Sequence, residues 1–141
     1  MLLIFLLFPL DLYQGLGLET IRSAFTEVPP ESAPLIKLLL TALALAAGFK
    51  GGEFIPLVFI GTTTASLIAH FTHQPLSFFA GLGFVGLFAA AAKTPWTCTI
   101  LAIEYFGWEM APSAIMVTWL GTLVAGPAGI YPGQRHAHQT V

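Results

Sequence analysis

Charged side chains are absent from two long stretches of this chain. No Asp, Glu, Lys or Arg lies between Glu53 and Lys93, and none lies between Glu109 and Arg135. The hydrocarbon core of a bilayer is about 30 Å thick, and a helix of roughly 20 apolar residues crosses it. Both stretches are long enough for such a helix, so the pattern predicts a protein that is integral to a membrane.

Pro, Gly and polar residues divide the apolar sequence into several short helices. Pro near the start of a run and Gly at its end mark helix boundaries. The predicted helices lie at 18–25, 33–48, 54–71, 76–93, 95–105 and 110–126. Short membrane helices interrupted by Gly or Pro are typical of transporters with discontinuous helices. The expected fold class is an all-α integral membrane protein, a multi-pass bundle of short, broken and tilted helices.

The chain divides into four parts on the same evidence. We expect a partial membrane helix at 1–14, a loop with a short helix at 15–32, a transmembrane helical region at 33–126 and a polar tail at 127–141. The first part has neither the basic start nor the small-residue cleavage site of a secretory signal. It is more typical of the end of a longer helix.

Composition supports the membrane interpretation and excludes other classes. Of the 141 residues, 56% are apolar and only 9% are charged, against about a quarter charged in soluble domains. A net charge of −2 gives no indication of a nucleic-acid partner, and the single cysteine excludes a disulfide scaffold. The sequence holds no H-E-x-x-H and no G-x-S-x-G motif, so we expect neither an enzyme nor a cofactor.

The segment 51–56, Gly-Gly-Glu-Phe-Ile-Pro, combines a glycine pair with a helix start. The first turn of a helix leaves N–H groups without intrahelical partners, and its aligned dipoles make that end positive. Pro56 is tolerated there, because an early helical N–H is unpaired anyway. Gly51 and Gly52 remove side-chain bulk and would let another group approach the backbone. The segment predicts an anion site made of backbone amides; an interfacial helix start with Glu53 as a favourable acid is the open alternative.

This segment and three others resemble one family. Residues 52–56 match the G-x-F-x-P signature of the CLC chloride channels and proton-coupled anion antiporters. LYQGLGLETI (12–21) resembles the glycine-rich segment of that family, and 84–104 resembles its G-x-x-A-x-x-A-x-x-[KRN]-x-P stretch. Gly129-Ile130-Tyr131 resembles the segment that holds the family's ion-gating tyrosine. The resemblance covers nearly the whole chain in order.

The resemblance implies membrane anion transport, by a channel or by exchange for protons, in a multi-pass protein of the cell membrane. This chain would form the C-terminal part of a CLC-like inverted-repeat fold and supply the G-x-F-x-P wall of the central anion site. The backbone amides of Glu53, Phe54 and Ile55, together with the hydroxyl of Tyr131, would face the anion. Around them, Gly51, Gly52 and Pro56 would shape the site.

Two loops that the family uses for its anion pathway, of the G-S-G-I-P and G-[KR]-E-G-P types, do not occur in this sequence. The alternative function is therefore a truncated CLC-like fragment without transport activity, acting as a membrane-embedded interaction piece. A separately encoded N-terminal half is an expected partner, besides the lipid bilayer. The resemblance also implies a homodimer through the helices of 76–126, which we expect to pack on Gly83, Gly86 and Ala90.

The sequence leaves two alternatives for the anion, chloride and fluoride. FKGGE (49–53) and LGFVGLFAAAAKTP (82–95) resemble the fluoride-exporting branch, whose typical form is Gly-Gly-Glu-x-Thr-Pro. Here Ile55 stands where that branch has a threonine. Fluoride is small and strongly hydrated, so the loss of a hydroxyl donor matters for its selection.

Other polar residues receive structural interpretations. His70 and His73 lack a third ligand nearby, so we expect no metal site and interfacial histidines instead. We also expect Cys98 to be a packing residue and Glu104 to be interfacial beside aromatic residues. Lys37 is expected to extend to the membrane interface.

The threonines are predicted to make local hydrogen bonds, and four aromatic residues are predicted to form a surface. Thr62, Thr63 and Thr64 are expected to bond back to helix carbonyls, and Thr94 to cap the helix that follows it. A lipid-facing or dimer surface is predicted for four aromatic residues, namely Phe78, Phe79, Phe84 and Phe88.

Overall fold

The computed structural model describes residues 16–48, 52–127 and 129–130. All regular structure in these residues is helical, as predicted. The elements are α2 (Leu18–Ser23), α3 (Ala33–Ala46), α4 (Phe54–Phe71), α5 (Leu76–Ala92), α6 (Pro95–Phe106), the 3-10 helix η1 (Trp108–Met110) and α7 (Ala111–Val124). The predicted partial helix at 1–14 and, within the predicted tail, residues 128 and 131–141 lie outside the described residues.

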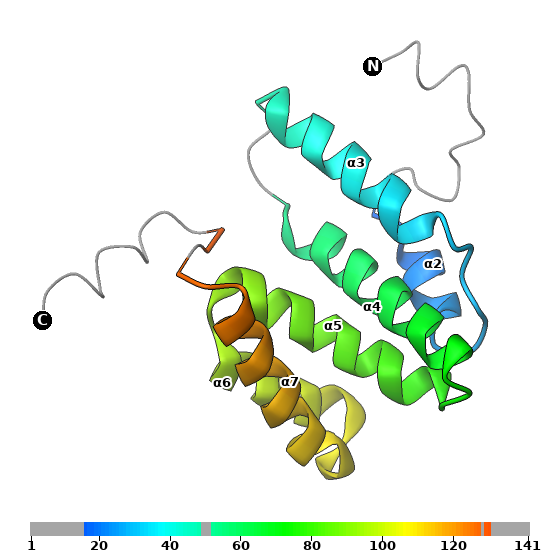
Figure 1. Ribbon diagram of the computed structural model, residues 1–141, viewed down its shortest axis with the longest axis vertical. Helices are drawn as coiled ribbons and strands as arrows, with labels where there is room; N and C mark the ends of the chain where they lie inside the picture. The colour runs from blue at the N-terminus through cyan, green and yellow to red at the C-terminus, as the bar shows by residue number, and fades with distance from the viewer. Residues whose placement is uncertain (1–15, 49–51, 128, 131–141) are drawn as a thin grey trace, which may run out of the picture.

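Helices α4 and α5 lie side by side in the middle of the molecule (Figure 1). Helices α2 and α3 pack on α4, whereas α6 and α7 pack on α5 and on each other. Within the described residues, α4 is the one helix long and apolar enough to cross a membrane, and Ala33–Ala46 and Leu76–Ala92 are apolar but shorter. The expected all-α bundle of short apolar helices is therefore present.

Two glycines bring α4 and α5 into backbone contact. A Cβ atom added to Gly61 would overlap the carbonyl oxygen of Gly83, and one added to Gly83 would overlap the carbonyl oxygen of Gly61. Close approach of helices through small residues is a common packing mode in membranes. Larger side chains here would force the two helices apart.

A third glycine, Gly86, brings α5 close to α7. A Cβ atom on Gly86 would lie 2.5 Å from Cγ1 of Val117. Gly83 and Gly86 thus make close contacts with α4 and α7 of the same chain. The predicted dimer contact through Gly83, Gly86 and Ala90 stays a prediction.

The buried apolar residues form two clusters, one on each side of the α4–α5 pair. The first joins α2, α3 and α4 through Ile21, Ala33, Val58 and Phe59. The second joins α5, α6, η1 and α7 through Leu82, Val85, Ala89, Cys98, Ala102, Met110 and Ala114. Cys98 is 1% exposed, so it is a packing residue as predicted. Phe84 packs against both clusters and connects them.

The threonines of α4 differ in their hydrogen bonding. The hydroxyl of Thr63 donates to the carbonyl of Phe59 at 2.7 Å, as expected for a back-bond. Thr62 is completely buried, and its Oγ1 has no hydrogen-bond partner among the described residues. The predicted back-bond of Thr62 is wrong, because it needs the side-chain rotamer that aims the hydroxyl at the preceding turn. Thr64 is exposed, and no back-bond is seen for it.

Lys37 and Thr94 also depart from expectation. Lys37 is 5% exposed, and its Nζ lies 5.2 Å from the ring centroid of Phe59. Its side chain turns inward because the ring face attracts the cation, so the predicted extension to the interface is wrong. Thr94 precedes α6 but makes no side-chain cap. Its hydroxyl lies 3.7 Å from Sγ of Cys98 instead.

Candidate functional site

The predicted anion segment lies at the start of α4. Glu53 occupies the position before the helix, and Gly52 has a φ of 79°, in the left-handed region. A Cβ atom added to Gly52 would meet nothing within 4 Å. Glycine is therefore favoured here for its backbone conformation. The space beside Gly52 leaves room for the approach of another group that the sequence predicts, and Gly51 lies outside the described residues.

The first turn of α4 presents two N–H groups without partners inside the helix. The first intrahelical bond runs from the N–H of Leu57 to the carbonyl of Glu53, at 3.2 Å. The N–H groups of Phe54 and Ile55 precede this bond, and Pro56 has none to offer. The helix has 18 residues, so its aligned dipoles make this end positive. The arrangement can accept an anion without a basic side chain.

An aromatic contact holds this first turn against α5. The ring of Phe54 lies 4.7 Å from the ring of Phe88, with an interplanar angle of 86°, and 6.3 Å from the ring of Phe84. Edge-to-face pairs of this kind contribute about 0.5–1.5 kcal/mol beyond area burial. Phe84 and Phe88 were predicted to face lipid or a dimer partner, and this is wrong. Their spacing of four residues on one helix face was the signal that they act together.

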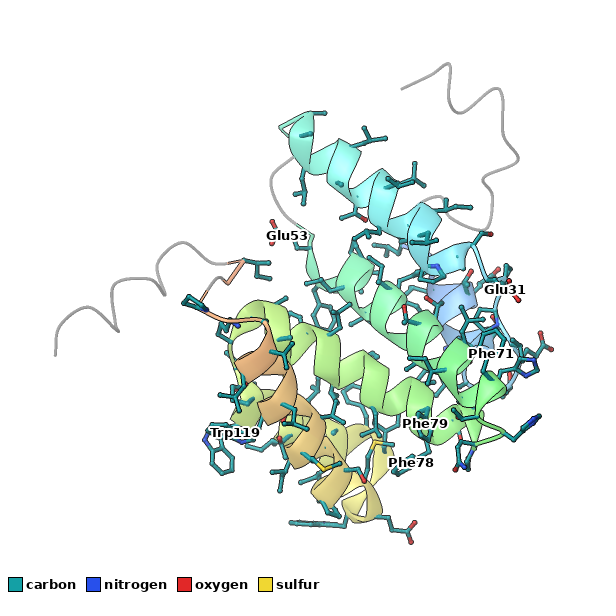
Figure 2. The ribbon with its side chains drawn as sticks, viewed as in Figure 1. Glu31, Glu53, Phe71, Phe78, Phe79 and Trp119 are labelled. Atoms are coloured by element: carbon teal, nitrogen blue, oxygen red, sulfur yellow. The ribbon has the colours of Figure 1, made fainter. Side chains whose placement is uncertain are left out.

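The remaining residues of the segment differ in exposure. Phe54 is 37% exposed, so its ring keeps one open side. Ile55 packs against the cluster around Val58 and Phe59, and Pro56 is half-buried. Glu53 is half-buried too, and its side chain lies at the open start of α4 (Figure 2).

A second predicted segment returns to the same part of α5. The N–H of Ile130 donates to the carbonyl of Ala91 at 3.0 Å. Tyr131 follows directly in the sequence and lies outside the described residues. Phe88 and Ala91 both lie in the last two turns of α5, so this end of the helix contacts Phe54 and also the residue before Tyr131. The structure thus brings two segments far apart in sequence to one end of α5.

Sequence analysis missed Lys93 as a candidate. Its Nζ donates to the carbonyl of Thr122, near the end of α7, at 3.0 Å. The signal was available, because Lys93 is the first charge after a long uncharged stretch and precedes a Pro by two residues.

The other polar candidates lie on the surface. His70 and His73 are exposed at the end of α4, and the described residues contain no group of three or more metal-ligating side chains. Glu104 is exposed beside Tyr105, which is 69% exposed, and near Trp108, which is 78% exposed. This outward position beside aromatic residues fits the interfacial interpretation of Glu104.

An apolar groove of about 600 Å³ lies between α4, α5 and α7. Small residues, among them Gly61, Ala65 and Gly86, line it together with aliphatic side chains. Thr64 supplies the one polar side chain in the lining that the described residues provide. This groove offers an anion almost nothing to bind, whereas the start of α4 offers two N–H donors.

A helical fold with an apolar helix of spanning length, whose first turn offers N–H groups without intrahelical partners, is compatible with an ion-transport protein. Residues 1–126 match the family described as Voltage gated chloride channel. The chain belongs to this family, the CLC family of channels and transporters. The predicted resemblance is confirmed, and so is the prediction that the chain belongs to membrane ion transport and not to an enzyme class.

Relatives show how much of the family fold the chain covers. It is 41% identical over 128 residues to the chloride/fluoride channel protein of Pseudomonas syringae pv. tomato, covering 91% of this chain and 28% of that protein. It is 28% identical over 99 residues to the putative ion-transport protein YfeO of Salmonella newport, covering 67% of this chain and 24% of that protein.

A solved structure is similar in fold. The crystal structure of a CLC-type fluoride/proton antiporter matches with a TM-score of 0.86 and 32% sequence identity, over 94% of this chain and 34% of that one. The chain therefore spans about a quarter to a third of the length of these relatives.

Proposed function

We propose that this chain supplies the G-x-F-x-P wall of the central anion site in a CLC-type transporter. The observation that carries the proposal is the pair of N–H groups on Phe54 and Ile55, at the positive end of α4. Neither has a partner within the helix. The contact of Phe54 with Phe88 holds this turn in place, so the donors are oriented before an anion arrives. In this proposal Glu53 also offers its backbone N–H, and Gly51, Gly52 and Pro56 shape the turn.

Tyr131 is proposed as a second contact to the same anion, through its hydroxyl. The support is the hydrogen bond between Ile130 and Ala91, because it brings the preceding residue to the end of α5 that also contacts Phe54. A hydroxyl donor there would complement the amides of α4.

We propose fluoride as the preferred anion and chloride as the competitor. One relative is a chloride/fluoride channel protein and another is a fluoride/proton antiporter, and both names include fluoride. A compact anion gains most from closely spaced N–H donors, since hydrogen bonds to charged acceptors are the strong ones. The carboxylate of Glu53 lies beside this turn and would repel an anion while ionised.

Transport is proposed to require the remainder of the family fold. This chain spans 28% and 34% of two relatives, and it leaves large apolar side chains exposed on several helices. A partner is therefore expected to cover the open side of Phe54. The alternative function, a membrane-embedded piece without transport of its own, applies where that remainder is absent.

A homodimer is proposed through the outer faces of α6 and α7. Trp96 and Ile100 of α6 are 64% and 57% exposed, and Met116 and Leu123 of α7 are 59% and 70% exposed. Trp96 packs edge-on against Trp119 across the two helices, with ring centroids 5.6 Å apart. The groove lined by Gly83, Gly86 and Ala90 is the other surface of the same helices on which a second copy could pack.

Flux from loaded liposomes tests the proposed function. The chain is reconstituted alone, and also together with the N-terminal part of the Pseudomonas relative supplied as a second chain. We expect fluoride efflux faster than chloride efflux from the pair and no efflux from the chain alone. Selective efflux from the chain alone would contradict the need for the remaining fold. A pair that co-purifies but transports neither anion would leave only the non-transporting alternative.

A further inference from the structure

A continuous series of ring contacts links four parts of the molecule and ends at the first turn of α4. Neighbouring rings lie 4.7 to 6.3 Å apart, measured between their centroids. The rings come from the segment after α2, the end of α6, the middle of α5 and the start of α4, and we call them the ring series: Phe25, Tyr105, Phe106, Phe84, Phe88 and Phe54. Aromatic pairs at such separations attract each other beyond the burial of their surface area. The ring series therefore connects the start of α4 with the end of α6.

Phe84 occupies the branching point of the ring series. Its ring centroid lies 6.3 Å from that of Phe54 and 6.0 Å from that of Phe106, with interplanar angles of 84° and 78°. The ring of Tyr105 lies 6.1 Å away. Phe84 also packs against both buried clusters. Its ring is thus in contact with the start of α4 and with the end of α6 at the same time.

The two aromatic neighbours of Phe54 differ in what supports them. Phe88 is the nearer, at 4.7 Å, but its ring has no second aromatic neighbour among the described residues. Phe84 contacts Phe106, which is held on its other side by stacking on Phe25 at 5.7 Å and 23°. Phe84 is therefore the ring that links Phe54 to aromatic residues outside α5.

We propose that Phe84 is a positioning residue for the anion donors at the start of α4. Its edge-to-face contact restricts the ring of Phe54, and the backbone N–H groups of Phe54 and Ile55 are restricted with it, because a phenylalanine side chain has few torsions. The contact with Phe106 in turn restricts the ring of Phe84. This proposal rests on the proposed function for the anion, whereas the ring contacts are a property of this chain.

The mobility of the Phe54 ring tests the contact in the chain as it exists, purified in detergent. Phe84→Leu keeps an apolar side chain and removes the ring, and Phe106→Leu removes the support one contact further away. We expect the NMR order parameter of the isotope-labelled Phe54 ring to fall in Phe84→Leu and, by a smaller amount, in Phe106→Leu. The second variant keeps the test decisive if the first folds poorly.

Phe79→Leu is the matched control for these variants. It makes the same substitution on the same helix, at a ring that is paired with Phe78 and lines the apolar groove. We expect the Phe54 ring to stay unchanged in this variant. An unchanged Phe54 ring in both Phe84→Leu and Phe106→Leu, or an equal change in Phe79→Leu, would overturn the proposal.

The dependence of efflux on fluoride concentration tests the functional consequence in the reconstituted pair of chains. Misplaced donors weaken anion binding, so Phe84→Leu should raise the half-saturating fluoride concentration roughly 2- to 10-fold, the range expected for the loss of one aromatic pair. Phe79→Leu should not raise it. A purely structural role would instead lower the maximal rate and leave the half-saturating concentration unchanged, and this result for Phe84→Leu would overturn the functional part.

A double-mutant comparison decides whether Phe84 acts through Phe54. Phe54→Leu removes the ring and keeps the backbone N–H. In this background Phe84→Leu should cause no further rise in the half-saturating concentration. A full additional rise would show that Phe84 acts on the anion by another route and would overturn the proposal. If no pair transports, the proposed function fails, while the mobility of the Phe54 ring still decides whether Phe84 holds it.

Discussion

The middle and the start of α4 differ in the contacts that they make. In its middle, Gly61 meets Gly83 of α5 backbone to backbone, and the apolar groove borders one side of this crossing. At its start, Phe54 is 37% exposed and two N–H groups lack helical partners. The crossing is formed by two helices of this chain, whereas the start presents donors that no other residue of α4 can pair. The difference shows that one chain can form the helix packing that supports a binding site and still leave part of that site to be formed by other residues.

The largest expected effect comes from breaking the crossing. Gly83→Leu places a branched side chain where an added Cβ already overlaps the backbone of α4. We expect a loss of about 3 kcal/mol in the free energy of unfolding, the upper end of the usual cost of overpacking. Thermal unfolding in detergent measures it. Ala42→Leu, on the exposed face of α3, adds similar bulk and serves as the control. Equal stability of the two variants would mean that the contact does not limit the packing.

The next effect is expected at the open start of α4. Ile55→Pro removes one N–H donor in the first turn, where proline fits a helix without breaking it. A hydrogen bond to a charged group contributes about 1.5–3 kcal/mol, so fluoride affinity in the reconstituted pair should fall roughly 10- to 100-fold. Ile55→Val keeps the N–H and should bind normally. Normal affinity in the proline variant would remove this amide from the site.

A smaller effect on stability is expected from replacing a buried polar side chain in the middle of α4. The N–H groups in the first turn of α4, which lack partners within the helix, are proposed to bind an anion, whereas the hydroxyl of Thr62, without a partner among the described residues, only costs stability. Thr62→Val should therefore raise the free energy of unfolding by about 1 kcal/mol. Thr63→Val, which removes a back-bond, should not raise it. Chemical unfolding in mixed micelles compares them, and a destabilised Thr62→Val would reveal a hydrogen bond to that hydroxyl.

The helices could be predicted from sequence because their boundaries depend on local residues. Pro34 lies in the first turn of α3, and Gly48, with a φ of 85°, follows its end. The start of α4 was found for the same reason, since Gly52 and Pro56 are local signals. Family resemblance then linked this start to anion transport.

Side-chain partners could not be predicted in the same way. The small residues of α5 indicated close packing, but sequence does not say which helix faces Gly83. Lys37 turns toward Phe59 because tertiary packing brings α3 to α4. Thr94 instead meets Cys98 four residues on, a local alternative to the predicted cap. The tie between Lys93 and Thr122 joins residues 29 positions apart, so no local pattern indicates it.

The Gly61–Gly83 contact has a mechanical consequence. Neither glycine has a side chain whose rotamer could change, so the crossing cannot be adjusted by repacking its own residues. The separation of α4 and α5 at the crossing is therefore set by the two backbones. Phe88 and Ala91 lie at one end of α5, where Phe88 contacts Phe54 and the carbonyl of Ala91 accepts the N–H of Ile130. A displacement of this end of α5 would thus reach both the first turn of α4 and Ile130.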